Sequence, residues 1–137
     1  MNDSTVYECT PLNLGIVNGD RGSLTVVENQ QTIPFDINRI YYLYDIPSGS
    51  KRGGHAHKDL WQIILAASGS FDLVLDDGKV RRRVSLNRPH VGVLVVPGIW
   101  RELENFSAGA VCLVLASEKY LEDDYIRDYD EFLRIKN

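Results

Sequence analysis

Short apolar runs separated by turn residues are the feature of this chain that most limits its fold. The runs are rich in Val, Ile and Tyr, a composition typical of strands. No long amphipathic helix interrupts them, which argues against a parallel βαβ architecture. The pattern predicts one all-β domain over residues 1–137, a β-sandwich or barrel. Strands are expected at Ser23–Glu28, Arg39–Asp45, Trp61–Ala67, Gly69–Leu75, Lys79–Leu86, Val91–Val96 and Ala110–Ser117.

Two local patterns refine this prediction. Asp77 and Gly78 form a pair that tolerates positive φ, so they are expected to close a hairpin between two of the strands. Near the C-terminus, apolar and aromatic side chains recur at helical spacing and predict a short helix docked on a sheet. The members of that stripe are Leu121, Tyr125, Tyr129 and Phe132.

Composition excludes several classes of protein. The 137 residues carry 15 basic and 19 acidic side chains, a net charge of −4, so nucleic-acid binding is disfavoured. No apolar stretch approaches the length of a membrane helix. The start, MNDSTVYECT, lacks the basic and apolar regions of a signal peptide, which favours a cytoplasmic protein. Cys9 and Cys112 match no zinc-ligand or CxxC spacing, and cysteine catalysis is not expected.

The segment with the most chemistry contains two histidines, His55 and His57, two residues apart. On a strand both imidazoles point to the same face, which inside a small barrel is the lumen. Glycines flank the pair at Gly49 and Gly69, and Gln62 lies between the histidines and the second glycine. This spacing resembles the first cupin motif, with Gln62 in place of the usual glutamate.

The second cupin motif is also recognisable, from Gly92 to Asn105, with Arg101 where the motif has a histidine. The two motifs together predict a cupin-type jelly roll with a short C-terminal helical segment. A cupin metal site uses three imidazoles and one carboxylate, whereas this chain offers two imidazoles, an amide and a guanidinium. An arginine has no lone pair for a metal and repels a divalent ion. The sequence therefore predicts no metal and no other cofactor.

Basic residues accompany the two motifs although the chain is acidic overall. A jelly roll would bring these cations to one mouth, where guanidinium groups pair bidentately with phosphate oxygens. A phosphorylated ligand is therefore expected. Tyr41 shares strand parity with Arg39 and could stack on a base or bond a sugar, while Tyr42 and Tyr44 face the other way. The candidate ligand-binding residues are Arg21, Arg39, Tyr41, Arg52, Lys58 and Arg101.

A closer resemblance covers nearly the whole chain, from about residue 20 to residue 132. The blocks that carry it are Arg21–Leu24, Ile33–Tyr42, Arg52–Lys58, Leu115–Ser117 and Asp124–Asp130. They are similar to the dTDP-4-keto-6-deoxyglucose 3,4-ketoisomerases, also called the WxcM-like family. The resemblance implies a homodimer, often with exchanged N-terminal strands, acting on a dTDP-linked 4-keto-6-deoxy sugar in the synthesis of 3-amino sugars for bacterial surface polysaccharides.

The residues fit that chemistry. Moving a ketone from C4 to C3 is a redox-neutral tautomerisation through an enediol, and two imidazoles can supply the acid and the base. The resemblance assigns His55 as the base and His57 as its partner in proton transfer, with the order of the two left open. Family members carry His or Arg at position 101, and Arg21 together with Arg101 leaves the C4 configuration of the product open.

Three other functions compete with this one. A 3,5-epimerase on the same substrate class would use a histidine–aspartate pair and a tyrosine acid, an arrangement that we do not expect in this short chain. A non-catalytic sugar-nucleotide-binding cupin would bind the ligand without turnover. A metal-dependent cupin such as a dioxygenase would contain a stoichiometric ion.

Overall fold

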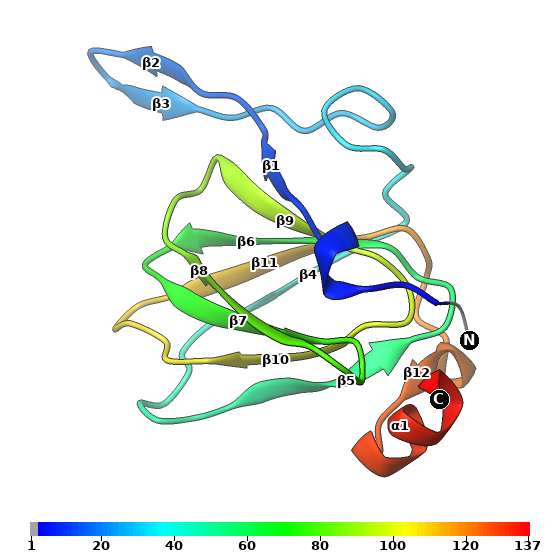
Figure 1. Cartoon of the computed structure of the whole chain (residues 1–137). Helices are drawn as coiled ribbons and strands as arrows, with labels where there is room; N and C mark the ends of the chain where they lie inside the picture. The colour runs from blue at the N-terminus through cyan, green and yellow to red at the C-terminus, as the bar shows by residue number, and fades with distance from the viewer. Residues whose placement is uncertain (1–2) are drawn as a thin grey trace.

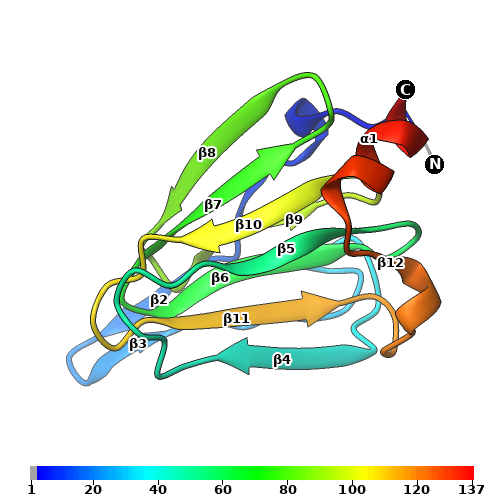
Figure 2. The same ribbon diagram turned by 90° about the horizontal axis from the view of Figure 1, so that it is seen from below.

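The computed structural model describes residues 3–137, which fold into two five-stranded antiparallel sheets packed as a sandwich (Figures 1 and 2). The first sheet has the order β1-β9-β6-β11-β4. Its strands are β1 (Pro11–Asn13), β9 (Val91–Val95), β6 (Gln62–Ser68), β11 (Val111–Ala116) and β4 (Arg39–Leu43). The all-β prediction and the jelly-roll-like sandwich are confirmed.

The second sheet has the order β12-β5-β10-β7-β8. Its strands are β12 (Tyr125–Ile126), β5 (Arg52–His57), β10 (Trp100–Glu104), β7 (Phe71–Asp76) and β8 (Arg81–Leu86). The hairpin predicted at Asp77-Gly78 joins β7 to β8, and Gly78 has the positive φ of +91° that such a turn requires.

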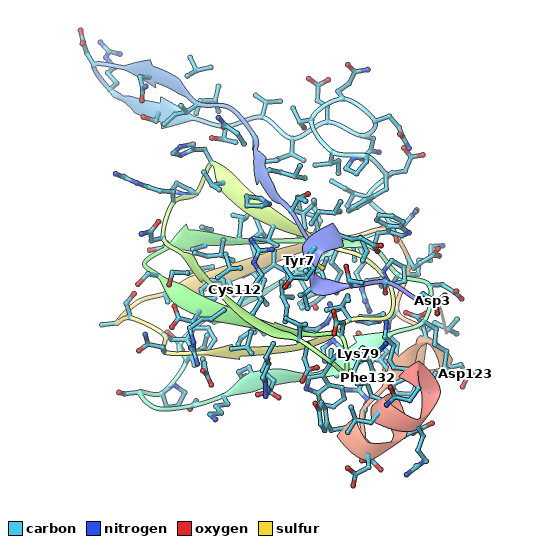
Figure 3. The ribbon with its side chains drawn as sticks, viewed as in Figure 1. Asp3, Tyr7, Lys79, Cys112, Asp123 and Phe132 are labelled. Carbon is cyan, nitrogen blue, oxygen red and sulfur yellow. The ribbon has the colours of Figure 1, made fainter. Side chains whose placement is uncertain are left out.

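Apolar residues of both sheets fill the space between them. Ile63 and Val114 of the first sheet and Leu73 and Leu103 of the second are fully or almost fully buried in one cluster. Cys112 also lies inside the sandwich, and burial raises the pKa of its thiol to about 12 (Figure 3). This thiol is therefore a small core side chain rather than a nucleophile.

A separate hairpin of β2 (Val17–Gly19) and β3 (Gly22–Leu24) projects away from the sandwich (Figure 1). The strand predicted at Ser23–Glu28 is therefore wrong in extent, since only its first two residues are in β3. The hairpin buries none of its own side chains in this chain, and Val17 and Leu24 are 63% and 59% exposed. Such exposure of apolar side chains on a projecting hairpin is typical of a surface that another chain covers.

The C-terminal helix begins later than the aromatic stripe predicted. Residues Glu122–Asp124 form a 3-10 turn, η2, and Tyr125 and Ile126 are extended because they pair with His57 and Ala56 of β5. Leu121, expected on the docked face, is 59% exposed. The helix α1 runs from Tyr129 to Lys136, after Asp128, whose side chain accepts a hydrogen bond from the backbone N–H of Asp130.

Helix α1 covers one end of the second sheet, below the body in Figure 1. Phe132, labelled in Figure 3, is completely buried and packs against Trp100 with the ring centroids 5.8 Å apart. Another 3-10 turn, η1 (Val6–Glu8), precedes β1. In the described part of the chain no helix is long and apolar enough to cross a membrane.

Candidate active site

A cavity of about 540 Å³ opens between the two sheets and the segment that follows β11. Residues of β4, β5, β6, β10 and β11 form its walls, and Tyr120, Tyr125 and Arg127 close it from the C-terminal side. Five of the residues predicted from the sequence line it: Arg39, Tyr41, Arg52, His55 and Arg101.

The two histidines lie on one face of β5, as the two-residue spacing predicts. Their rings meet edge to face with centroids 4.8 Å apart. They differ in exposure, because His55 lines the cavity whereas His57 is completely buried and lies behind it. Only His55 is therefore in a position to touch a ligand.

Tyr125 completes this cluster. Its ring centroid is 5.0 Å from that of His55 and 4.3 Å from that of His57. Its hydroxyl accepts a hydrogen bond of 3.2 Å from Nη2 of Arg39, and the guanidinium of Arg127 lies 4.2 Å from the ring centroid. The sequence does not identify Tyr125 as a site residue. Its place in the site depends on the pairing of β12 with β5, which no local pattern reveals.

A buried hydrogen-bond chain forms another part of the cavity wall. Arg101, 1% exposed, donates to Oε1 of Gln62 and, from Nη2, to the carbonyl oxygen of Ile99 at 3.1 Å. Nε2 of Gln62 then donates to the hydroxyl of Tyr41 at 3.1 Å. Gln62 thus connects Arg101 to Tyr41, and it makes no hydrogen bond to His55 or His57.

The charge of Arg101 has no carboxylate partner: none of the ion pairs among residues 3–137 includes it. Burying a cation without a counter-ion is costly, and an anionic group bound in the cavity would offset that cost. Arg101 pairs in register with His55, which places this unneutralised charge beside the imidazole of the cavity.

The same environment keeps both imidazoles neutral. Burial, and then the charge of Arg101, lowers the pKa of His55 from 6.5 to about 3. These two causes also hold the pKa of His57 well below its usual value. At neutral pH each ring therefore has one lone pair that can accept a proton.

The free energy of unfolding should consequently decrease as the pH falls below 6.5. Above this pH the two histidines are neutral in both the folded and the unfolded chain. Below it they become protonated in the unfolded chain but stay neutral in the folded chain, down to about pH 3 for His55. Each histidine should contribute a slope of about 1.4 kcal/mol per pH unit. Urea titrations between pH 7 and 5 measure this slope, and His55→Asn should reduce it relative to wild type; an equal slope in both proteins would contradict the assignment.

Two of the predicted ligand-binding residues do not line this cavity. The side chain of Lys58 is exposed just beyond β5, and its backbone N–H donates to the carbonyl oxygen of Asp124 at 2.9 Å. Arg21 lies at the exposed turn of the β2–β3 hairpin, outside the cavity of its own chain.

The residues present do not fit a cupin metal. A metal ion would have to share the pocket with the buried guanidinium of Arg101, which is already bonded to Gln62, the residue in place of the carboxylate ligand. Within residues 3–137 no three His, Cys, Asp or Glu side chains are grouped to hold a metal.

The structure does contain a histidine–aspartate pair. Nδ1 of His57 lies 2.8 Å from Oδ2 of Asp124, and Tyr125 packs against the same ring. The sequence-based expectation that this arrangement is missing is wrong. The partners are 67 residues apart, and η2 brings Asp124 to the end of β5.

Comparison with known proteins agrees with this geometry. The two-sheet sandwich has a cupin-like fold; a 3,5-epimerase from Bacillus anthracis, 18% identical, shares the fold with a TM-score of 0.77 over 89% of this chain and 79% of its own. The family model described as FdtA, WxcM-like, C-terminal, matches residues 7–137. The chain belongs to this WxcM-like family of TDP-sugar 3,4-ketoisomerases.

Individual relatives are consistent with this assignment. A TDP-4-oxo-6-deoxy-α-D-glucose 3,4-oxoisomerase from Aneurinibacillus thermoaerophilus is 43% identical over 88% of this chain and 87% of its own. A 3,4-ketoisomerase from Helicobacter canadensis is 49% identical, with a TM-score of 0.91 over 94% of this chain and 97% of its own. A sugar 3,4-ketoisomerase from Thermoanaerobacterium thermosaccharolyticum, solved with TDP, is 37% identical with a TM-score of 0.94 over 96% of both chains. A histidine-to-asparagine variant of it was solved with TDP-4-keto-6-deoxyglucose.

Proposed function

We propose that this chain converts TDP-4-keto-6-deoxyglucose into the TDP-linked 3-keto-6-deoxyhexose through an enediol, with His55 as the base. The observation that carries the proposal is a neutral imidazole, that of His55, in a cavity whose charged lining residues are all arginines. The substrate is inferred from the relatives, which act on or bind this sugar nucleotide.

The proton balance of the reaction needs no oxidant. His55 takes the proton from C3, which is acidic because C3 is next to the C4 carbonyl, and the carbonyl oxygen becomes the enediol oxygen. C4 then gains a proton while the hydroxyl on C3 loses its own, which leaves a ketone at C3. An acid and a base positioned for these transfers contribute about 10²–10⁴ in rate.

Two groups on the cavity wall can stabilise the negative charge that develops on the enediol oxygen. Arg101 provides a fixed cation without a counter-ion. Tyr41 accepts a hydrogen bond from Gln62, so its own proton remains for a ligand, and burial raises the pKa of its phenol so that this proton is retained. Arg39 and Arg52, which also line the cavity, are the groups that we assign to the diphosphate.

The reaction in this proposal uses no metal, because Arg101 and Gln62 replace the ligands that a cupin metal needs. The product is the precursor of a 3-amino-3,6-dideoxyhexose, since a 3-ketone is the group that an aminotransferase would convert. The cytoplasmic location expected from the sequence remains a prediction.

A solvent-exchange experiment tests the proposal. Chelator-treated protein is incubated with TDP-4-keto-6-deoxyglucose in deuterated water and followed by proton NMR. We expect a 3-keto product with deuterium at C4, and the coupling constants of that product would identify its C4 configuration. Exchange at C3 and C5 without movement of the carbonyl would instead indicate a 3,5-epimerase. Tight binding without exchange would indicate a binding protein.

The proposal also includes a homodimer with exchanged N-terminal segments. The apolar residues of the β2–β3 hairpin are exposed in a single chain, and Arg21, in the turn of that hairpin, is not among the residues that line its own cavity. In a dimer the hairpin of one chain can cover the partner, and Arg21 can then serve the partner's cavity.

Mixed dimers should reveal this arrangement. Arg21→Ala and His55→Asn homodimers should each be inactive or nearly so. Co-expressed together, about half of the dimers are mixed and have one intact site of two, so we expect about a quarter of wild-type activity. Absence of recovery in the mixture, or an active Arg21→Ala homodimer, would contradict a role for Arg21 across the interface. Light scattering checks the dimer itself.

A further inference from the structure

Asp124 is a buried carboxylate to which the proposed reaction assigns no role. Its side chain is only 7% exposed and divides its two oxygens between different donors. Oδ1 accepts a hydrogen bond of 2.7 Å from the backbone N–H of Asp59, and Oδ2 lies 2.8 Å from Nδ1 of His57. Because the backbone N–H of Asp59 can only donate, Oδ1 is committed to it.

This contact fixes the position of the proton on His57. The ring is neutral, so it carries one proton, and the carboxylate of Asp124 can only accept. The proton is therefore on Nδ1, and Nε2 carries the lone pair. Nε2 of His57 is buried and has no hydrogen-bond partner within residues 3–137, so the lone pair is not used by the protein.

We propose that Asp124 is a positioning residue that holds His57 in the Nδ1-protonated tautomer, so that His57 is a proton acceptor beside His55. This inference rests on the proposed isomerisation. His57 does not line the cavity, and Asp124 acts through it rather than on the substrate.

The tautomer matters because His55 becomes positively charged when it takes the C3 proton. With its ring centroid 4.8 Å from that of His55, a neutral His57 with a free lone pair favours this charge. The opposite tautomer would carry the proton at Nε2 and have its lone pair at Nδ1, which faces residue 124 rather than being free. Holding the first tautomer thus favours the protonated state of His55 that the enediol step requires.

Asp124→Asn should reverse the tautomer with little change of shape. The amide oxygen of the new side chain must still accept from the N–H of Asp59, so its NH₂ group faces Nδ1 of His57. Nδ1 then has to accept, and the proton moves to Nε2. In serine proteases the equivalent exchange leaves the geometry intact and lowers kcat about 10⁴-fold. Because His57 does not touch the substrate, we expect a smaller loss here, about 10²-fold in kcat, with KM and TDP affinity nearly unchanged.

Long-range ¹H–¹⁵N NMR of the histidine rings reads the tautomer directly. We expect Nδ1–H for His57 in wild type and in Asp124→Glu, and Nε2–H in Asp124→Asn. Asp123→Asn is the matched control, because it removes one charge from the adjacent, exposed position and should change neither the tautomer nor kcat. Thermal melting of each variant verifies folding.

Two results would overturn the proposal: Nε2–H on His57 in the wild-type chain, or an Asp124→Asn variant with the reversed tautomer and unchanged kcat. The wild-type spectrum decides the first even when a variant fails to fold. A protein that makes no 3-keto product would refute the proposed function, whereas the spectrum would still report the tautomer, so the two failures are distinguishable.

Discussion

Replacing His55 with asparagine should abolish isomerisation and leave TDP binding in place. His55 is the histidine that lines the cavity, and because its pKa is lowered its imidazole is unprotonated, with a lone pair for the C3 proton, throughout the neutral range. An asparagine of similar size cannot accept the C3 proton. We expect the rate of 3-keto product formation to fall by at least about 10³-fold, within the range that a general base contributes. Solvent deuterium should also no longer enter at C4.

His90→Asn is the matched control, because it replaces the third histidine of the chain, whose side chain is outside the cavity. Its turnover should equal that of wild type. Calorimetric titration with TDP separates catalysis from binding, and the His55→Asn variant should bind within about threefold of wild type. A variant at His55 that retains a tenth or more of the rate would remove this residue from the role of base.

Replacing Arg101 with glutamine should lower kcat by about 10³-fold and leave TDP affinity nearly unchanged. Arg101 pairs in register with His55, its side chain is buried, and it forms no ion pair with a carboxylate within residues 3–137. A preorganised cation in a dry site stabilises charge that develops only in the transition state, and removing such a group typically costs about 10²–10³ in kcat.

Arg52→Gln provides the contrast, because Arg52 lines the same cavity but is exposed. If it binds the diphosphate, its loss should raise KM about tenfold with little change in kcat. Steady-state kinetics of both variants measure the difference, with circular dichroism to verify folding. A normal kcat in Arg101→Gln accompanied by a large loss of stability would make Arg101 a structural residue.

The sequence correctly predicted the strands in which apolar and polar residues alternate or apolar residues form a run, such as β6, β7 and β11. It did not mark β5 or β10 in the list of expected strands, although the His-x-His pair was placed on a strand. The sequence of β5, RGGHAH, has little β propensity, and that of β10, WRELE, contains good helix formers. Both are strands because β7 pairs with β10 and β10 with β5, which is tertiary information.

The site was also predicted only in part, because some of its residues are placed by tertiary contacts that the sequence does not reveal. The spacing of the motifs located His55, Arg101 and Gln62, which lie on strands β5, β10 and β6. The parity of β4 correctly separated Tyr41, on the cavity wall, from the exposed Tyr42. Tyr125 was missed because it was assigned to a helical stripe, whereas it pairs as a strand with β5. Asp124 was missed because it reaches His57 through the 3-10 turn η2, 67 residues further along the chain.

The distribution of the lining residues over the sandwich has a consequence for engineering. Gln62 and Arg101 come from β6 and β10, in the interior of the two sheets, whereas Arg39 and Tyr41 come from β4, an outermost strand, and Tyr120, Tyr125 and Arg127 from the segment after β11. Substitutions on an outermost strand or in a connecting segment disturb fewer neighbours than those in the middle of a sheet. Libraries aimed at a different nucleotide or sugar are therefore best confined to β4 and to Tyr120, Tyr125 and Arg127, with Asp124 and the interior pair left unchanged.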